Sequence, residues 1–190
     1  MIVGLDFDNT IACYDGLFHR LAVERGLIDA DHAADKTAIR DGLRAAGRED
    51  DWTELQGLAY GPRIVEAEPF PGAVDCIAAL HEAGGAGVVT YIVSHKTRTP
   101  YRGEPHDLHA ACRAFLTRYG ISPALIPATR VFLEPTKEAK IERIRALGCT
   151  HFVDDLPEFL AEPTFPAIEK LNFGRAGLAD WAAVRGRLEV

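Results

Sequence analysis

Short apolar runs and helical patterns alternate along most of the chain. Five runs have the length and the Val, Ile or Phe content of buried strands: Ile2 to Leu5, Gly87 to Val93, Arg130 to Leu133, His151 to Val153 and Ala167 to Phe173. Apolar residues recur at helical spacing in Gly72 to Ala83, Asp107 to Tyr119, Thr136 to Leu147 and Leu178 to Leu188. This alternation predicts an α/β fold, with a Rossmann-like parallel sheet between two layers of helices.

One long segment interrupts the alternation. From Ala12 to about Glu68 the sequence has helical patterns, such as Gly16 to Arg25 and Asp31 to Ala46, and no convincing strand. We therefore predict a core domain of residues 1–11 and 70–190 and a small helical cap of residues 12–69. Ligands bind at the carboxyl ends of such strands, so the insertion is a candidate lid, and an ordinary helical subdomain is the alternative.

Composition narrows the possible functions. The chain has 190 residues, with 21 basic and 28 acidic residues and a formal net charge of −7, which argues against a nucleic acid polymer as partner. The apolar run before Asp6 is too short for a signal peptide or a membrane span, so we expect a cytoplasmic protein without a membrane partner. The four scattered cysteines fit neither a disulfide framework nor a zinc site, and we expect reduced thiols.

Acidic residues follow two of the predicted strands. Asp6 and Asp8 come directly after the first strand, and their spacing puts both carboxylates on one side of an extended chain. The pair Asp154-Asp155 follows the strand at His151. Carboxylates that converge repel one another unless a cation neutralises them, and oxygen ligands of this kind favour Mg²⁺. The sequence therefore predicts a Mg²⁺ site at the strand ends.

A cation held by carboxylates usually also binds phosphate, and two further residues suit that chemistry. Ser94 ends the second predicted strand, where its hydroxyl can donate to a phosphoryl oxygen. Lys137 lies in the first turn of the helix that Thr136 begins, where it can supply a compact positive charge.

With these residues in this order, the chain resembles the haloacid dehalogenase-like (HAD) hydrolase superfamily. The loop Asp6-Phe7-Asp8-Asn9-Thr10, Ser94, Lys137 and Asp154-Asp155 match its four signatures in sequence. The resemblance covers roughly residues 1–11 and 70–175. It implies strand order 5-4-1-2-3, counting the predicted strands along the chain, and a helical cap inserted after the first strand.

The resemblance also implies a mechanism. Asp6 attacks phosphorus and becomes an aspartyl phosphate, while Asp8 protonates the leaving oxygen and then deprotonates the hydrolytic water. Mg²⁺ is held by Asp6, the backbone carbonyl of Asp8 and the pair Asp154-Asp155, of which either member could touch the metal. Asp8 favours phosphatase chemistry, because dehalogenases attack carbon and need no second acid.

The superfamily's lysine normally opens its helix, so the resemblance favours Lys137 as the catalytic lysine and leaves Lys140 as a solvated helix charge.

Substrate contacts are expected beside these residues, from Asn9 and Thr10 and from the basic segment that begins with His95, Lys96 and Arg98. Guanidinium and ammonium groups there can bind a second anionic group, although a solvated surface loop is the alternative. Protein partners are left open.

The function expected from these features is that of a Mg²⁺-dependent phosphomonoesterase. Its substrate would be a small cytoplasmic phosphate ester, such as a sugar phosphate or a nucleotide. Two alternatives remain: a catalytically degenerate HAD-like protein that binds a phosphorylated ligand or partner, and a HAD hydrolase that cleaves another bond, as dehalogenases and phosphonatases do.

Overall fold

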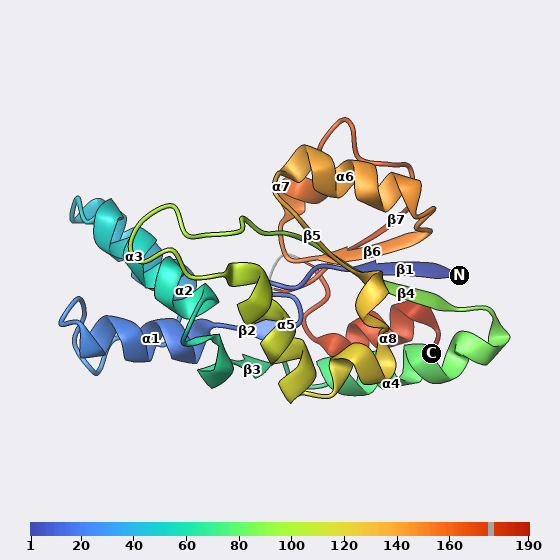
Figure 1. Ribbon diagram of the computed structural model, residues 1–190, viewed down its shortest axis with the longest axis horizontal. Helices are drawn as coiled ribbons and strands as arrows, with labels where there is room; N and C mark the ends of the chain where they lie inside the picture. Colours follow the sequence, from blue (N-terminus) through green and yellow to red (C-terminus); the bar gives the residue numbers. More distant parts are fainter. Residues whose placement is uncertain (175–176) are drawn as a thin grey trace. The chain divides into compact units, whose positions relative to one another are not determined.

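The structure is a computed structural model that describes residues 1–174 and 177–190 (Figure 1). Contacts divide the chain into two compact units, which we name by their content. The sheet unit comprises residues 1–12, 69–97 and 116–190, and the helical unit comprises residues 13–68 and 98–115.

The sheet unit is built on five parallel strands. They are β1 (Ile2–Leu5), β4 (Val89–His95), β5 (Val131–Glu134), β6 (His151–Asp154) and β7 (Glu169–Asn172), and they lie in the order β5-β4-β1-β6-β7. Counted along the chain from the other edge, this order is 5-4-1-2-3, so the predicted Rossmann-like sheet is confirmed. Because β1 is central, the loop that follows it lies between the ends of β4 and β6.

Helices cover both faces of this sheet. In Figure 1, α4 (Ala73–Glu82) and α8 (Trp181–Leu188) lie on one face, while α6 (Lys137–Ala146) and α7 (Pro157–Leu160) lie on the opposite one. The helix α5 (Leu108–Arg118) precedes β5 in the chain. Shorter helical turns are η1 (Ile64–Glu66), η2 (Ala83–Ala86), η3 (Ile121–Leu125) and η4 (Ala128–Arg130).

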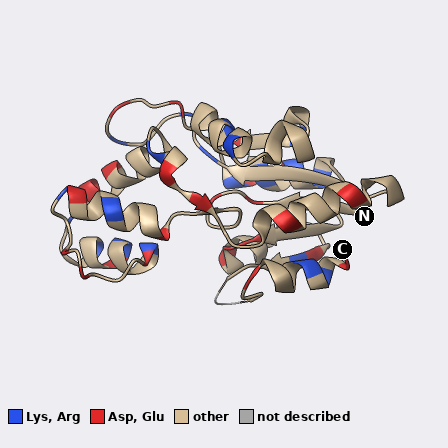
Figure 2. Ribbon diagram, turned by 90° about the horizontal axis from the view of Figure 1, so that it is seen from below, with Lys and Arg blue, Asp and Glu red and all other residues tan. Residues whose placement is uncertain are grey.

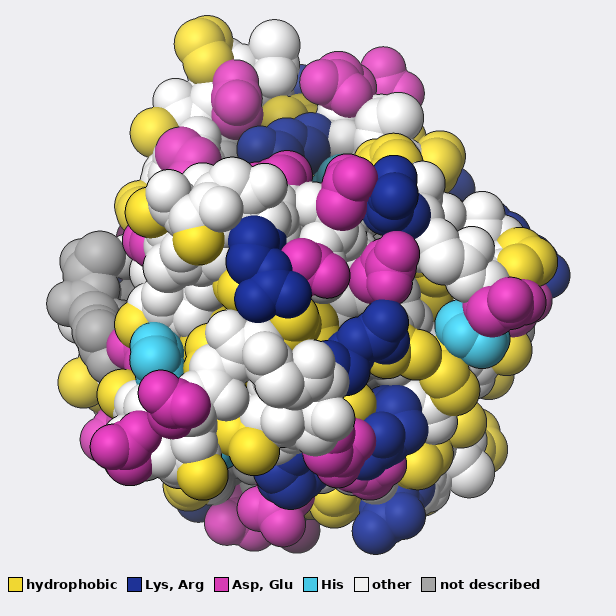
Figure 3. Space-filling model, turned by 90° about the vertical axis from the view of Figure 1, so that its left-hand side faces the viewer, with side chains coloured by type: hydrophobic (Ala, Val, Ile, Leu, Met, Phe, Trp, Pro, Cys, Tyr) yellow, Lys and Arg dark blue, Asp and Glu magenta, His cyan; other side chains and the backbone are white. Residues whose placement is uncertain are grey.

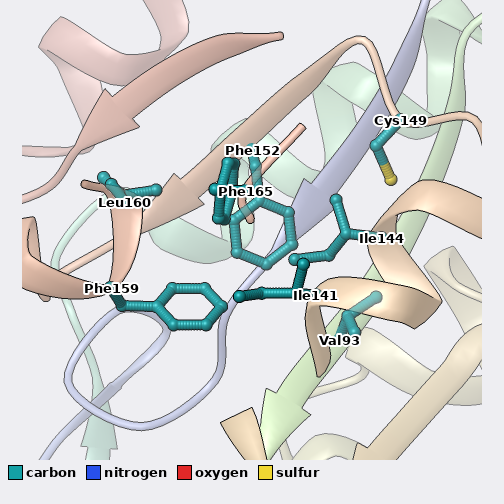
Figure 4. Packing of buried hydrophobic residues seen from close by; sticks show 8 residues of the cluster. All are labelled: Val93, Ile141, Ile144, Cys149, Phe152, Phe159, Leu160 and Phe165. Atoms are coloured by element: carbon teal, nitrogen blue, oxygen red, sulfur yellow. The ribbon is translucent and has the colours of Figure 1, made fainter. Parts of the chain in front are cut away.

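An apolar cluster fixes α6 and α7 to the sheet. Figure 4 shows Ile141 and Ile144 of α6 directed toward Phe152 of β6 and Phe159 of α7, and these side chains are at most 4% exposed. The cluster also contains Val93, Cys149, Leu160 and Phe165. Burial of large apolar side chains is worth about 1.5–3 kcal/mol for each of them, so this packing holds α6 in one rotational setting on the sheet.

The helical unit has its own core. It contains α1 (Asp15–Glu24), α2 (Lys36–Ala45) and α3 (Glu49–Tyr60). Trp52 stacks on Phe18 with ring centroids 4.7 Å apart, and Tyr14 meets Tyr60 edge to face at 5.0 Å. Offset and edge-to-face contacts of this kind are the preferred geometries of aromatic pairs.

Charges of both signs are spread over the protein. Figure 2 shows acidic and basic positions on both units, and acidic, basic and apolar side chains are intermixed on the face drawn in Figure 3. Many of them pair locally, as Arg44 does with Glu49 at 2.7 Å.

The structure differs from the sequence prediction in residues 98–115, which belong to the helical unit and not to the predicted core. Arg102 explains part of this grouping, because its guanidinium lies 3.1 Å from Asp50 and 3.4 Å from Glu54 of α3.

A two-stranded sheet lies at the two ends of the segment that was predicted to lack strands. It pairs β2 (Ala12–Cys13) with β3 (Glu68–Pro69). Two residues are too few for an alternating pattern to be detected.

All four cysteines are free thiols. Within residues 1–174 and 177–190, helices long and apolar enough to cross a membrane are absent.

Candidate active site at the carboxyl ends of β1, β4 and β6

The acidic loop after β1 is a tight turn that backbone hydrogen bonds close. The N–H groups of Ile11 and Ala12 both donate to the Phe7 carbonyl at 3.0 Å, and the Asn9 N–H donates to the Ala12 carbonyl at 3.0 Å. Asn9 has φ +55°, a left-handed conformation that Asn adopts more readily than most residues. The turn therefore keeps the acidic side chains of the loop close to the end of β1.

Asp6 is joined to β6 by a buried lysine. Lys140 Nζ lies 2.6 Å from Asp6 Oδ1 and 2.6 Å from Asp154 Oδ2. The three side chains are 4%, 7% and 0% exposed for Lys140, Asp6 and Asp154 respectively. The same ammonium lies 4.3 Å from the centroid of the Phe159 ring, a distance at which a cation is attracted to the ring face.

Lys140, and not the expected Lys137, is therefore the lysine that contacts the acidic residues, which favours it as the lysine of the site. Lys137 opens α6 and is half-buried, while Lys140, one turn later, belongs with Ile141 and Ile144 to the buried face of the helix. Helical side chains lean toward the N-terminus of their helix, so a point level with the start of a helix is reached by a residue farther along it. Lys140 reaches back to the strand ends in this way.

Burial and charge act in opposite directions on this cluster. Burial alone would lower the pKa of Lys140, but the charges and hydrogen bonds of Asp6 and Asp154 outweigh it and raise the pKa. Burial raises the pKa of Asp154 to about 6, the charge of Asp6 acts in the same direction, and Lys140 opposes them. Asp154 also accepts a hydrogen bond from the Leu156 N–H at 2.9 Å, at the start of α7.

Three carboxylates converge where the sequence predicted a metal. Asp6, Asp154 and Asp155 each offer an oxygen, and these oxygens lie within 4.8 Å of one another. Mg²⁺–O distances are about 2.0–2.1 Å, so the oxygens bound by one ion lie at most about 4.2 Å apart, which is close to the spacing of these carboxylates. Lys140 places one positive charge against the carboxylates of Asp6 and Asp154, and Asp155 adds a third carboxylate beside them. The donor set and the charge therefore both fit a hard divalent cation.

Ser94 offers a hydroxyl that has no partner among the described residues. Its side chain is 1% exposed, and its Oγ lacks a hydrogen bond within residues 1–174 and 177–190. A buried hydroxyl without a partner costs about 1–3 kcal/mol. A ligand oxygen that accepted from Ser94 would remove this cost.

Asp8 forms an ion pair with Lys96. The ammonium of Lys96 lies 2.8 Å from Asp8 Oδ2 and 3.0 Å from Asp8 Oδ1. Lys96 is expected to contact substrate, and in the structure it contacts Asp8, which is a catalytic candidate. The spacing Ser94-x-Lys96, parallel to Asp6-x-Asp8, is the sequence signal that could have suggested this.

Thr10 lies at the end of the acidic loop and is fully buried. Its Oγ1 is 3.5 Å from Asp6 Oδ2, and its carbonyl accepts a hydrogen bond of 3.0 Å from the indole Nε1 of Trp181. Sequence reasoning did not identify Trp181, because nothing near it in the chain points to a contact 171 residues away.

His95 and Arg98 are the other two candidates for substrate contact. His95 alternates with Ser94 and Lys96, and its Nε2 is 3.2 Å from the Pro135 carbonyl. Burial, with the charges of Lys140 and Lys137, lowers the pKa of His95, against the opposing effect of the Pro135 carbonyl. Arg98 is 72% exposed in the helical unit, where it pairs with Asp107 at 2.8 Å.

Sequence comparisons identify no relative. No model of a known protein family matches the chain, and no curated protein sequence matches it.

Solved structures of the same fold do exist. A HAD-superfamily hydrolase from Ehrlichia chaffeensis has a TM-score of 0.57 at 14% identity, over 98% of this chain and 95% of its own. A HAD-family hydrolase from Deinococcus radiodurans R1, solved with bound phosphate and sodium, has a TM-score of 0.57 at 16% identity, over 98% and 87%. A subfamily IA HAD hydrolase from Geobacter sulfurreducens PCA scores 0.51 at 12% identity, over 90% and 86%. The chain therefore has the HAD-like hydrolase fold.

Proposed function

We propose that this chain, with its HAD-like hydrolase fold, is a Mg²⁺-dependent phosphomonoesterase that acts on a small cytoplasmic phosphate ester. The observation that carries the proposal is the pair of carboxylates Asp6 and Asp8 after β1, each held by its own buried lysine. One carboxylate suits a nucleophile and the other a general acid and base, and phosphate transfer through an aspartyl phosphate needs both.

In the first half of the reaction, an Asp6 oxygen forms a bond to phosphorus as the bond to the leaving oxygen breaks. Asp8 gives its proton to that oxygen, so an alcohol leaves. In the second half, water attacks the aspartyl phosphate, Asp8 takes the water's proton, and inorganic phosphate leaves Asp6 as a carboxylate.

The surrounding residues lower the cost of bringing an anion to an acidic site. Lys140 neutralises part of the charge of Asp6 and Asp154, and the unpartnered Ser94 hydroxyl can donate to a phosphoryl oxygen. Asp6, Asp154 and Asp155, with the backbone carbonyl of Asp8, would hold Mg²⁺. When bound, the ion supplies positive charge to the phosphoryl oxygens and orients Asp6.

The phosphate bound in the Deinococcus radiodurans hydrolase supports this chemistry for the shared fold. Asp8 favours a phosphate ester over a carbon–halogen bond, because attack on carbon with loss of halide needs no proton donor. Sugar phosphates and nucleotides are the substrate classes to test first.

The test is release of inorganic phosphate from an aryl phosphate, from sugar phosphates and from nucleotides, after EDTA treatment and with Mg²⁺ restored. We expect activity only with Mg²⁺, and none from Asp6→Asn. Asp75→Asn is the matched control, since Asp75 is an exposed aspartate of α4 in the same unit. Asp75→Asn should keep native activity.

Two further readouts separate the alternatives. Acid-quenched protein should carry covalent phosphate in the native chain and in Asp75→Asn, and none in Asp6→Asn. Halide release from haloacids in place of phosphate release would favour a dehalogenase. Thermal stabilisation by a phosphate ester without turnover would favour a binding protein.

A further inference from the structure

Lys96 is placed by an extension of β4. Its N–H donates to the Glu134 carbonyl at 2.8 Å and so continues the pairing of β4 with β5 beyond His95. Side chains alternate along an extended chain, so Ser94 and Lys96 share one side. Both are buried, while His95 between them is half-buried beside Pro135. The strand therefore directs Lys96 toward the acidic loop.

The ammonium bridges the two oxygens of Asp8. The distances of 2.8 Å and 3.0 Å make both oxygens acceptors of one donor group, which fixes the plane of the carboxylate as well as its position. The Lys96 side chain is 3% exposed and that of Asp8 is 20% exposed. Limited access of water strengthens such a pair relative to one on the surface.

The surroundings of the ammonium also limit where it can move. Lys96 Nζ lies 5.6 Å from the centroid of the Phe7 ring. Phe7 is fully buried and stands between Asp6 and Asp8 in the sequence. The lysine thus contacts the loop at Phe7 and at Asp8. A substrate anion at Lys96 would compete with Asp8 for the charge of the ammonium.

We propose that Lys96 is a positioning residue, which holds the Asp8 carboxylate where it exchanges a proton with the leaving oxygen and then with water. The inference rests on the proposed function and adds a residue to it. Misplacement of a reacting group by about 1 Å can cost about 100-fold in rate, so loss of Lys96 should lower kcat by about that factor. KM should stay near its native value, because Lys96 acts through Asp8 and not on the substrate.

The test is a double-mutant cycle with Lys96→Met, Asp8→Asn and the double variant, each assayed with an alkyl phosphate and with p-nitrophenyl phosphate. A leaving group that departs as a stable anion needs little proton donation. We therefore expect Lys96→Met to lose about 100-fold in kcat with the alkyl ester and less than about 10-fold with the aryl ester. In the Asp8→Asn background, Lys96→Met should have no further effect.

Lys170→Met is the matched control. Lys170 lies on β7 with its ammonium 4.9 Å from the Phe165 ring, so it tests loss of a lysine above an aromatic ring away from the acidic loop. It should keep native kinetics. Lys96→Arg, which keeps the charge, should recover part of the activity that Lys96→Met loses.

These assays distinguish failure of this inference from failure of the proposed function. A native chain that releases no phosphate overturns both. An active native chain in which Lys96→Met loses the same factor with and without Asp8, or loses affinity with kcat unchanged, overturns this inference alone.

Discussion

Lys140 Nζ lies 2.6 Å from Asp6 Oδ1, and this contact links the start of α6 to the carboxyl end of the central strand β1. The two residues are 134 positions apart in the chain. The same ammonium reaches Asp154 of β6, so one lysine holds two strand ends together. This relationship favours Lys140 over Lys137 as the lysine of the site.

Lys140→Met should abolish activity and lower stability. Removal of one partner from a buried ion pair costs about 3–5 kcal/mol, because the remaining charges lose their compensation. We expect a fall in the free energy of unfolding of that size by urea denaturation. We also expect at least a 100-fold loss of phosphate release, because the positive charge beside Asp6 is lost.

Lys137→Met provides the comparison within the same helix. Its side chain is half-buried at the first residue of α6, and we expect activity within about threefold of native and a stability change within about 0.5 kcal/mol. A large loss in Lys137→Met with activity retained in Lys140→Met would reverse the assignment.

Ser94→Ala should separate binding from stability. The hydroxyl has no partner among the described residues, so its removal should leave the ligand-free protein unchanged or stabilise it by about 1 kcal/mol. The same change should lower phosphate release by about 10- to 100-fold, since a donor to the phosphoryl group is lost. Thermal unfolding of the ligand-free protein measures the first effect, and the phosphate-release assay measures the second.

Thr90→Val is the control for this prediction. Thr90 is also on β4, is 6% exposed, and its Oγ1 likewise lacks a partner within the part of the chain that the structure describes. Its loss should stabilise the protein with activity unchanged. Equal losses of activity in Thr90→Val and Ser94→Ala would mean that the strand, and not the hydroxyl, is responsible.

His95 should contribute to the pH dependence of stability. Its pKa is lowered in the folded protein, chiefly by burial, whereas the unfolded chain titrates near 6.5. Below that pH the unfolded state therefore binds more protons at this residue, so stability falls as the pH decreases from 7 to 5. His95→Gln should show a smaller fall in Tm over this range. A steeper fall would contradict the direction of the shift.

The thiols should react slowly in the folded protein. Burial raises the pKa of Cys76 and of Cys149 to about 11, from an ordinary value of 9.0. A rise of two units lowers the thiolate fraction about 100-fold at pH 8, and the thiolate is the reactive form. We expect slow modification of these two by an aromatic disulfide reagent, and fast modification of all four thiols in guanidinium chloride. Rapid native reaction at Cys149 would exclude this packing.

Much of the sheet unit could be predicted from local patterns. The apolar runs at Ile2, at Gly87 and at His151 correspond to β1, β4 and β6, and Thr136 caps α6 by accepting a hydrogen bond from the Ala139 N–H at 3.1 Å. Strand and cap signals involve residues that are neighbours in the chain, which is why one sequence is enough to detect them.

The acidic residues that follow the strands could also be identified from the sequence. Asp6 and Asp154 end neighbouring parallel strands, so their convergence follows once the strand order is known. The grouping of residues 98–115 could not be predicted, because the ion pairs of Arg102 with α3, such as the one with Glu54, join residues 48 or more positions apart, and no local pattern encodes such contacts.

The sequence alone determined the order of strands and helices and the acidic loop between β1 and the helical unit, since periodicity and residue type act over a few positions. Only the tertiary structure decided that Lys140 and not Lys137 meets Asp6, that Lys96 bridges Asp8, and that Trp181 holds the Thr10 carbonyl. Each of these contacts depends on how a helix or strand is rotated against its neighbours. That rotation is set by the packing of side chains from distant parts of the chain. Ile141 and Ile144 of α6, for example, pack in one cluster with Phe152 of β6.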